Sequence, residues 1–464
     1  MHKRFTYFIF IFLLAVGLTS CIEDSFTTSP SDVLTFGSDS LRLGPVYTAE
    51  LSPTAKMTVH NRASKMLSVQ SITVEGSDAQ YVNLNVDGLA GREFTDVEIR
   101  PNDSIFIMMN ARLPENGYDD ARALDARVVF MTNGVRQTIP VAAKAQDLQR
   151  LDALTVSSDL TLRPGKPYRV TDSLVVATGA TLTLEPGVRL LFHDKSEMVV
   201  RGTLRSMGTA QNPVVMTGDK LGNVVTDISF DIMSRQWEGL WFTPTSRSNT
   251  LQHTEIANTV YGVTIAGDGD GNSPDLELIN CRLHNSADVV FAASQAHVEA
   301  LGCEFAEGGN GLVYLDGGTA LLNHCTLANN YLFAAIAGPA LGFAENEAGI
   351  PTADVQVINS IIYGLGPDLS HWDLADSQVF VRNTLFKSDG KDDDHFINCL
   401  WDKDPLYFTV RNDYFFDYRL REGSPAISVA DASLTDPRTA TDRYGLTRGT
   451  TPDLGAYVFN PAPM

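Results

Sequence analysis

Three cysteines, Cys281, Cys303 and Cys325, recur along this chain at a constant step of 22 residues. A constant step of this size indicates a repeat architecture, in which each coil of the chain stacks on the coil before it. Adjacent coils of parallel strands lie about 4.8 Å apart, so side chains at equivalent positions must match in size to avoid voids and clashes. One coil cannot bury its own apolar face, and stability must therefore come from stacking.

The cysteine position continues into coils that carry small hydroxyl residues instead. The aligned positions, each followed two residues later by an aliphatic residue or Phe, are Thr254, Cys281, Cys303, Cys325, Ser360 and Thr384. The residues directly before them are His253, Asn280, Gly302, His324, Asn359 and Asn383. In-register coils hold side chains parallel, whereas a disulfide needs converging Cβ atoms, so we expect the three stacked thiols to be reduced and buried.

The charge balance limits the choice of partner. The chain has 35 Lys plus Arg against 56 Asp plus Glu. Phosphate binding needs a basic face, so nucleic acid is excluded as a partner. An acid excess mostly serves solubility, and cation binding is the alternative interpretation.

The first residues have the pattern of an export signal. Lys3 and Arg4 precede the apolar run Phe5–Leu18, which is too short to span a bilayer comfortably. The following Leu18-Thr19-Ser20-Cys21 resembles the lipobox of bacterial lipoproteins. The resemblance implies that residues 1–20 are a signal peptide, that Cys21 carries lipid, and that the protein is anchored in the cell outer membrane, facing the periplasm or the cell surface.

The residues after Cys21 have two interpretations. Ile22-Glu23-Asp24-Ser25 resembles the surface-export signals of lipoproteins in the Bacteroides group, and a plain polar tether over residues 21–32 is the alternative. Residues 33–147 then read as short alternating strands: Lys56–Asn61, Leu67–Val74, Tyr81–Val86, Ser104–Ala111, Ala126–Thr132 and Gln137–Ala142. Asn133-Gly134 is a strong hairpin signal between the last two. We predict an immunoglobulin-like β-sandwich without a cysteine pair.

Residues 148–400 change to the pattern of coils. Leu184-Glu185-Pro186-Gly187-Val188, followed by Gly202-Thr203-Leu204, resembles the first coils of right-handed parallel β-helix proteins. Residues 401–464, with Ser424-Pro425-Ala426-Ile427 and Asp453-Leu454-Gly455, resemble the end of bacterial β-helix proteins of the choice-of-anchor Q type. Ser428 stands where that type usually has an aspartate. The resemblance implies that this last part closes the open end of the stack. The predicted fold is therefore all-β, a sandwich followed by a β-helix.

Three insertions fall at one phase of the coil and should project from one face as a shared rim. They are Ala266–Asp275, Gly338–Asp354 and Gly364–Ser377. The first contains Asp268, Asp270 and Asn272, oxygen ligands at alternate positions that suit calcium, although Ser273 and Ile279 break the EF-hand pattern. A solvated acidic turn is the alternative.

The third insertion contains His371, Trp372 and Asp373. An exposed Trp beside carboxylates can stack on a sugar ring while the acids accept hydrogen bonds from its hydroxyls, and a Trp packed against the coil is equally consistent. Before the regular coils, Trp237-Glu238-Gly239-Leu240-Trp241 resembles a packing step common in β-helix proteins. We therefore expect the rim to bind the ligand and this step to pack.

The sequence leaves three functions open. The first is a lipid-anchored, non-catalytic protein that binds glycan or another surface ligand through the six rim residues above, with no cofactor unless calcium binds. The second is a lyase or hydrolase of uronic-acid-type polymers that uses Asp268, Asp270 and Asp373. The sequence patterns of pectin-cleaving hydrolases are absent, and Arg282, the only basic residue beside the cysteines, shows no stacked acids. The third is a structural spacer, and the oligomeric state stays open.

Overall fold

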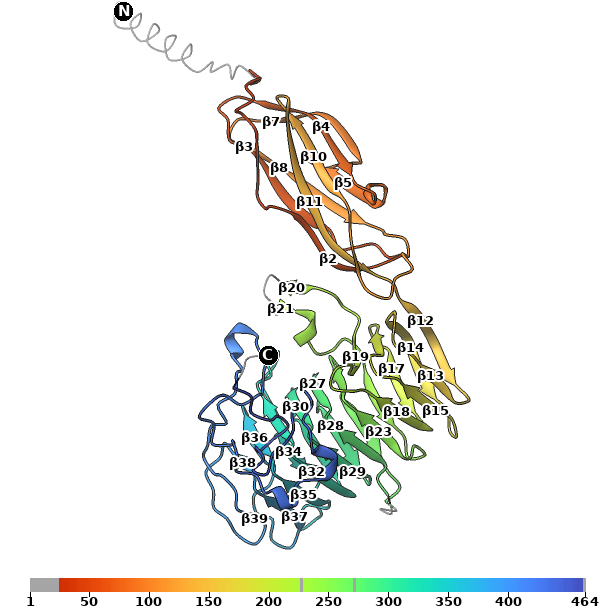
Figure 1. Ribbon diagram of the computed structural model, residues 1–464, viewed down its shortest axis with the longest axis vertical. Helices are drawn as coiled ribbons and strands as arrows, with labels where there is room; N and C mark the ends of the chain where they lie inside the picture. Colours follow the sequence, from red (N-terminus) through yellow and green to blue (C-terminus); the bar gives the residue numbers. More distant parts are fainter. Residues whose placement is uncertain (1–24, 226–227, 270–272, 462–464) are drawn as a thin grey trace, which may run out of the picture. The chain divides into compact units, whose positions relative to one another are not determined.

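The computed structural model describes residues 25–225, 228–269 and 273–461, and nearly all of its regular structure is β (Figure 1). The chain divides into two compact units. One comprises the residues through Gly117 together with 121–146, and the other comprises 118–120 and the residues from Asp147 onward. No helix in the described parts of the chain is long and apolar enough to cross a bilayer.

The first unit is a β-sandwich. One sheet has the strand order β1 (Leu34–Phe36), β3 (Ala55–Asn61), β8 (Ser104–Ala111), β5 (Val82–Val86) and β6 (Leu89–Gly91). The other has the order β2 (Leu41–Tyr47), β11 (Val135–Gln146), β10 (Arg127–Thr132), β4 (Leu67–Glu75) and β7 (Glu93–Ile99), with β9 (Arg122–Ala123) beside β11 and the short helix η1 (Ala79–Tyr81) after β4.

The predicted strands and hairpin are confirmed in this unit. Asn133 and Gly134 connect β10 to β11 with φ of 50° and 75°, the left-handed conformation that a tight hairpin requires. Alternate residues of both sheets, such as Ile72, Ile107 and Phe130, are fully buried between them. The alternation that the sequence shows is therefore the alternation between core and solvent.

Part of the predicted tether belongs to the sandwich. Phe26 pairs with Met66, and the Asn133 side chain donates hydrogen bonds of 3.0 and 2.9 Å to the carbonyls of Ser29 and Asp32. The tether predicted over residues 21–32 is therefore wrong for residues 25–32. Cys21 and the signal sequence lie outside the described residues.

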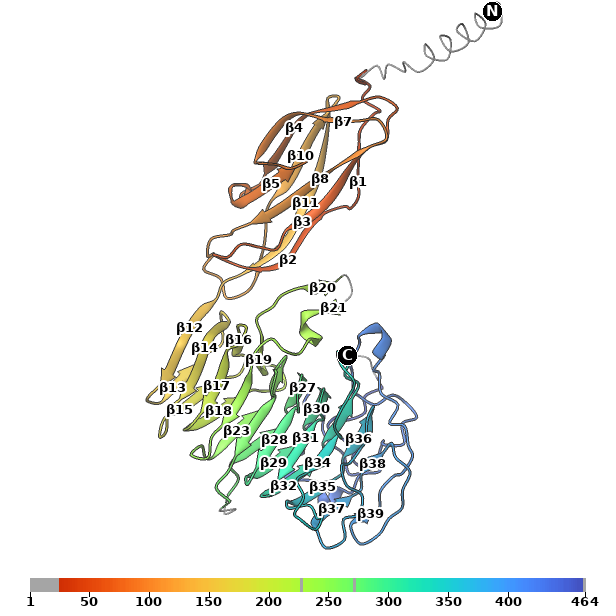
Figure 2. The same ribbon diagram turned by 180° about the vertical axis from the view of Figure 1, so that it is seen from behind.

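The second unit is a parallel β-helix, which confirms the predicted fold class (Figures 1 and 2). A ten-stranded parallel sheet forms one side, with the strands β13 (Leu160–Leu162), β15 (Thr181–Leu184), β18 (Thr203–Met207), β23 (Asn249–Gln252), β26 (Leu276–Ile279), β29 (His297–Leu301), β32 (Thr319–Asn323), β35 (Asp354–Ile358), β37 (Gln378–Arg382) and β39 (Phe396–Ile397).

The other two sides join into one sixteen-stranded sheet through β14 (Tyr168–Val176), which β12 (Gln149–Val156) also pairs. One arm contains β17 (Glu197–Val200), β22 (Gly239–Phe242), β25 (Val263–Ala266), β28 (Phe291–Ser294), β31 (Val313–Asp316) and β34 (Leu341–Phe343). The other arm contains β16 (Arg189–Phe192), β19 (Val214–Gly218), β24 (Thr254–Ala257), β27 (Arg282–Ser286), β30 (Glu304–Gly308), β33 (Thr326–Asn329), β36 (Ile361–Gly364) and β38 (Leu385–Phe386). A separate hairpin pairs β20 (Asn223–Val225) with β21 (Ile228–Ser229), followed by the short helix η2 (Phe230–Ile232).

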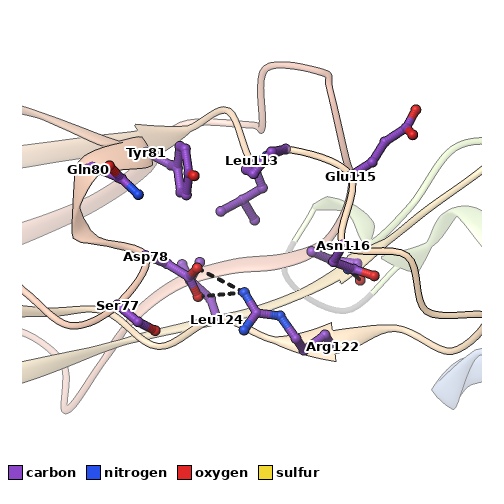
Figure 3. Close-up of a pocket in the computed structure, with 11 residues that line it drawn as sticks. Ser77, Asp78, Gln80, Tyr81, Leu113, Glu115, Asn116, Arg122 and Leu124 are labelled. Atoms are coloured by element: carbon purple, nitrogen blue, oxygen red, sulfur yellow. Dashed lines mark hydrogen bonds and ion pairs between the residues drawn. The ribbon is translucent and has the colours of Figure 1, made fainter.

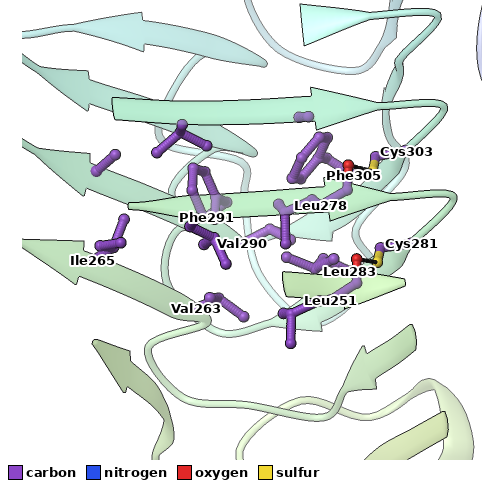
Figure 4. Close-up of a cluster of buried hydrophobic side chains, with 14 of the residues drawn as sticks. Leu251, Val263, Ile265, Leu278, Cys281, Leu283, Val290, Phe291, Cys303 and Phe305 are labelled. Atoms are coloured by element: carbon purple, nitrogen blue, oxygen red, sulfur yellow. Dashed lines mark hydrogen bonds between the residues drawn. The ribbon is translucent and has the colours of Figure 1, made fainter. Parts of the chain in front are cut away.

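Equivalent side chains stack inside the coils as predicted. Leu283, Phe305 and Leu327 lie in register on β27, β30 and β33, and all three are buried. Figure 4 shows Leu283 and Phe305 within this core. Burying a side chain of this size contributes roughly 1.5–3 kcal/mol, and the core continues without a break along the stack. Trp237 is part of it, stacked on Phe192 with ring centroids 3.9 Å apart, so the predicted packing role of Trp237 is confirmed.

The predicted stack of three reduced, buried cysteines, which we call the cysteine file, is confirmed as well. Cys281, Cys303 and Cys325 are free thiols and fully buried. Each donates to a carbonyl one coil earlier, at Sγ–O distances of 3.1, 3.4 and 3.2 Å. The thiols therefore act as small buried groups that fill identical places in consecutive coils.

The bend before each aligned position is left-handed. His253, Asn280, Gly302, His324, Asn359 and Asn383 all have φ between 41° and 67°. Asn and Gly tolerate this conformation best, which explains why they recur there. A Cβ at Gly302 would also lie 2.3 Å from the Asn280 side-chain oxygen, so any other residue there would require the Asn280 side chain to move.

The C-terminal segment, residues 404–461, covers the outer side of the arm that contains β24, β27, β30, β33 and β36 (Figure 2). The amides of Asn280, Asn323 and Asn359 donate to its carbonyls at 3.1, 2.8 and 2.9 Å. The segment contains the short helices η3 (Arg411–Asp413), η4 (Ala432–Leu434) and η5 (Pro437–Thr439). The sequence predicted an end closure for this segment, and the structure shows a cover along the side of successive coils.

Candidate functional site

The arm formed by β22, β25, β28, β31 and β34 presents its outward side chains to solvent. Its strands alternate strictly: Leu240 and Phe242 point into the core, so Trp241 points outward. Strand pairing then places Thr264, Ala292 and Tyr314 directly in register with Trp241, one per coil. We call this column, together with Tyr261 beside it, the outer face.

The outer face has an aromatic wall at each end and a floor of small side chains. Tyr261 and Tyr314 are 44% and 40% exposed. The Trp241 and Tyr261 rings meet edge to face with centroids 5.8 Å apart. Tyr314 lies three coils from Trp241, which corresponds to about 14 Å. Thr264 and Ala292 form the floor between these walls, a shape that accepts an extended, ring-containing ligand.

Polar groups line both edges of this face. On the edge where β28 and β31 end, Asp316 accepts a hydrogen bond from Ser294 Oγ at 3.0 Å. On the edge where they begin, Asp288 accepts from Asn310 Nδ2 at 2.7 Å. A whole four-residue strand separates the two carboxylates, at least about 10 Å at the rise of an extended chain. Glycosidases hold their two carboxyl groups about 5–9.5 Å apart, so these two do not form such a pair.

The predicted rim lies along the first of these edges. Asp268 follows β25 and forms an ion pair with Arg247, whose Nε also lies 3.5 Å from Asp275. Asp270 and Asn272 lie outside the described residues. No cluster of three or more His, Cys, Asp or Glu side chains that could hold a metal ion occurs within residues 25–225, 228–269 and 273–461. Calcium binding at this turn stays a prediction.

The other predicted rim residues lie at the far end of the stack. His371 Nδ1 lies 3.2 Å from Glu345 Oε1 of the preceding insertion. Asp373 accepts a hydrogen bond from the Ala375 N–H at 3.3 Å and so shapes its own turn. The Asp268 and Asp373 turns are four coils apart, about 19 Å. The rim therefore does not bring these acids to a common point.

Trp372 is mainly a packing residue. Its ring contacts Phe386, Phe396 and Trp401 at centroid distances of 5.5, 5.9 and 6.0 Å. It is 39% exposed at the edge of this aromatic cluster. Of the two interpretations, the structure favours the Trp packed against the last coils.

A buried charged network, which the sequence analysis missed, lies beneath the C-terminal segment. Arg282 Nε lies 2.6 Å from Glu304 and its Nη1 lies 3.6 Å from Glu255, and the two acids belong to the coils on either side. Arg443 of the C-terminal segment reaches Glu255 at 2.5 Å. The expectation that Arg282 has no stacked acids is wrong. The signal was present, because Glu255, Arg282 and Glu304 each follow an aligned cysteine-file position directly.

Two carboxyl groups in this region have opposite pKa shifts. Burial alone would raise the pKa of Glu255, but a hydrogen bond with His284 and the charges of Arg282 and Arg443 together hold it below its ordinary value. Burial raises the pKa of Glu307 to about 8, although Tyr418 shares a hydrogen bond with it. Glu307 is only 2% exposed, so the one strongly raised carboxyl in the described β-helix lies out of reach of a polymer.

A small pocket in the sandwich has a structural explanation. It encloses about 220 Å³ and is lined by Tyr81, Leu113 and Asn116 among others (Figure 3). At its base, the Asp78 carboxylate binds Arg122 at 2.8 Å and accepts from the Asp125 N–H at 3.0 Å. The charged groups of this pocket are thus used in holding two loops together.

Residues 154–278 match a family model described as a pectate-lyase-like β-helix domain. The match covers the first coils of the second unit. A search of curated proteins finds no match.

Two similar solved structures are glycoside hydrolases. One is a family 123 enzyme from Clostridium perfringens that hydrolyses glycolipid glycans, with 8% identity and a TM-score of 0.19 over 25% of this chain and 30% of that one. The other is the catalytic unit of a GH87 α-1,3-glucanase from Streptomyces thermodiastaticus, with 11% identity and a TM-score of 0.17 over 72% of this chain and 79% of that one. Superposition this poor establishes no common fold.

Proposed function

We propose that this protein binds a glycan along the outer face of its β-helix without cleaving it. In this proposal, lipid on Cys21 anchors the protein in the cell outer membrane, where it faces the periplasm or the cell surface. The proposal is carried by two aromatic walls about 14 Å apart over a floor of Thr264 and Ala292. One wall is half-buried Trp241 with exposed Tyr261, and the other is exposed Tyr314. Sugar rings present C–H faces that pack on aromatic rings and hydroxyls that bond to carboxylates and amides at the edges. The pectate-lyase-like family match supports a glycan-related role.

Binding without cleavage follows from the pairing, position and burial of the carboxyl groups near the outer face. Asp268 is neutralised by Arg247, and Asp288 and Asp316 lie on opposite edges of the face. Glu307, whose pKa suits a proton donor, is covered by the C-terminal segment. The outer face thus offers stacking surfaces and hydrogen-bond acceptors, and the two acids that lie close together at its edge, Asp268 and Asp275, share the cation Arg247.

The test is calorimetric titration of the full-length chain with a panel of oligosaccharides. Tyr314→Ala and Tyr261→Ala should each weaken binding about tenfold, equivalent to about 1.4 kcal/mol. Phe106→Ala is the matched control, because Phe106 is 44% exposed on the sandwich and should leave affinity unchanged. All three variants should unfold at the wild-type temperature, since none of the side chains belongs to a core.

The same samples are examined for reducing ends and for unsaturated products. No cleavage is expected after prolonged incubation. Affinity that is unaffected by Tyr314→Ala and Tyr261→Ala, or release of products that an inactive control lacks, would contradict the proposal.

A further inference from the structure

The charges around the outer face select among glycans. This inference rests on the proposed function of the face as a glycan site. We infer that the face accepts uncharged oligosaccharides and rejects polymers of uronic acids. The segments that flank β22, β25, β28 and β31 carry the acids Glu238, Asp268, Asp275, Asp288 and Asp316. The cations on the same described segments are Arg235 and Arg247.

One of these cations, Arg247, is already bound to acids. Arg247 binds Asp268 and lies 3.5 Å from Asp275, and it also donates to the carbonyls of Pro244 and Ser246 at 2.8 and 2.7 Å. The guanidinium N–H donors of Arg247 are therefore already used, whereas recognition of a carboxylate needs a free, planar pair of N–H donors. A uronate on the floor would gain no partner from Arg247 unless an existing ion pair broke.

Two further acids, Asp316 and Asp288, lie at the edges of the outer face. Asp316 continues the outward alternation of Tyr314 on β31, and Asp288 stands at the opposite edge. A uronic-acid polymer carries one negative charge on each sugar, so several of its carboxylates would lie between like charges. Such repulsion acts over about 30 Å at 0.01 M salt and only about 3 Å at 1 M salt. An uncharged sugar meets the same carboxylates as hydrogen-bond acceptors for its hydroxyls.

The length of the face adds a second selection. Trp241 and Tyr314 are separated by three coil steps, about 14 Å. One sugar ring cannot contact both walls, and a chain of sugars that runs along the coil axis can. Affinity should therefore rise with chain length until both aromatic walls are covered and then level off.

The experiment compares matched series of uncharged oligosaccharides (gluco-, xylo- and manno-oligomers) with oligogalacturonates and oligomannuronates of equal length, titrated into the full-length chain. At about 0.01 M salt the best uncharged oligomer should bind at least tenfold more tightly than any uronate, and the difference should shrink at about 1 M salt. The double variant Asp288→Asn, Asp316→Asn should improve uronate binding several-fold while it leaves uncharged ligands within about twofold, because amide groups still bond hydroxyls.

The outcomes separate the two proposals. Uronates that bind as tightly as uncharged oligomers at low salt, or discrimination that the double variant does not change, would overturn the charge selection and leave the glycan site intact. Absence of binding by every oligosaccharide in both series would overturn the site itself and the selection with it.

Discussion

Glu307 makes the stability of the β-helix depend on pH in an unusual direction. Its carboxyl group is buried, Asn330 N–H donates to Oε2 at 3.2 Å, and Tyr418 hydroxyl bonds to Oε1. Burial raises its pKa from 4.5 to about 8, so at neutral pH the folded chain keeps a proton on this carboxyl. Glu307→Gln replaces the protonated acid with a neutral group of the same shape that can donate to Tyr418 and accept from Asn330.

The size of the effect follows from the difference between the two pKa values. Below pH 4.5 both the folded and the unfolded chain hold the proton, and between pH 4.5 and 8 only the folded chain does. The contribution of Glu307 to the free energy of unfolding therefore falls as pH rises, by about 1.4 kcal/mol for each pH unit. Between pH 5 and 8 the loss is on the order of 4 kcal/mol. Above the folded pKa both states are ionised and the loss is complete.

Urea unfolding at several pH values between 5 and 8 measures this slope. All tryptophans of the chain, Trp237, Trp241, Trp372 and Trp401, belong to the β-helix, so their fluorescence reports its unfolding in the intact protein. The stability of Glu307→Gln relative to the wild type should rise with pH and be greatest at pH 8. This comparison removes the opposing contribution of His324, whose pKa burial lowers in both chains. The exposed carboxylate of Asp354 on β35 provides the control, and Asp354→Asn should keep the wild-type slope. A difference between Glu307→Gln and the wild type that stays the same from pH 5 to 8 would refute the reasoning.

Two further predictions concern the buried side chains. Arg282→Met leaves the 2%-exposed Glu304 without its cation and should lower the free energy of unfolding by about 3–5 kcal/mol. The control is Arg235→Met at an exposed position, which should change the free energy of unfolding by less than about 0.5 kcal/mol. Equal effects of the two substitutions in urea unfolding would rule out the network as a stabilising contact. In the native chain at pH 8 the three stacked thiols should resist an aromatic disulfide reagent, and half-buried Cys399 should react before them. Mass spectrometry of labelled peptides measures the order of reaction. Fast labelling of any stacked thiol before unfolding would contradict the burial of the three stacked cysteines.

The sequence predicted the coil stack because its evidence is periodic and local. The cysteine step, the aliphatic residue two places later and the Asn or Gly in the left-handed bend all repeat within each coil. The hairpin at Asn133 and Gly134 is local in the same way, since two residues alone determine the turn. Such features depend on few neighbours, so one sequence is enough to identify them.

The C-terminal segment could not be placed by the same reasoning. Its contacts join residues that are distant in the chain: Asn280 bonds to Thr441 across 161 positions, and Glu304 bonds to Tyr457 across 153. No periodic pattern relates these residues. The segment also supplies Arg443, Tyr457 and Tyr418 as partners of the buried acids Glu255, Glu304 and Glu307, so these contacts could not be recognised before it was placed.

The outer face was missed for a different reason. Trp241 belongs to a motif that the sequence assigned to packing as a whole, and the structure confirms this only for Trp237 and turns Trp241 outward. Tyr314 has no motif at all. Their relationship appears only when the two intervening coils are counted in register. The sequence analysis instead counted the stacked cysteines, which lie on another side of the coil.

A crystal structure of the protein with a bound uncharged oligosaccharide is the most direct test of the glycan face. The sugar rings should lie over Thr264 and Ala292, with one ring against Trp241 and another against Tyr314. Sugar bound instead at the insertion around His371 and Trp372, or contacts confined to the sandwich, would show that the outer face is not the site.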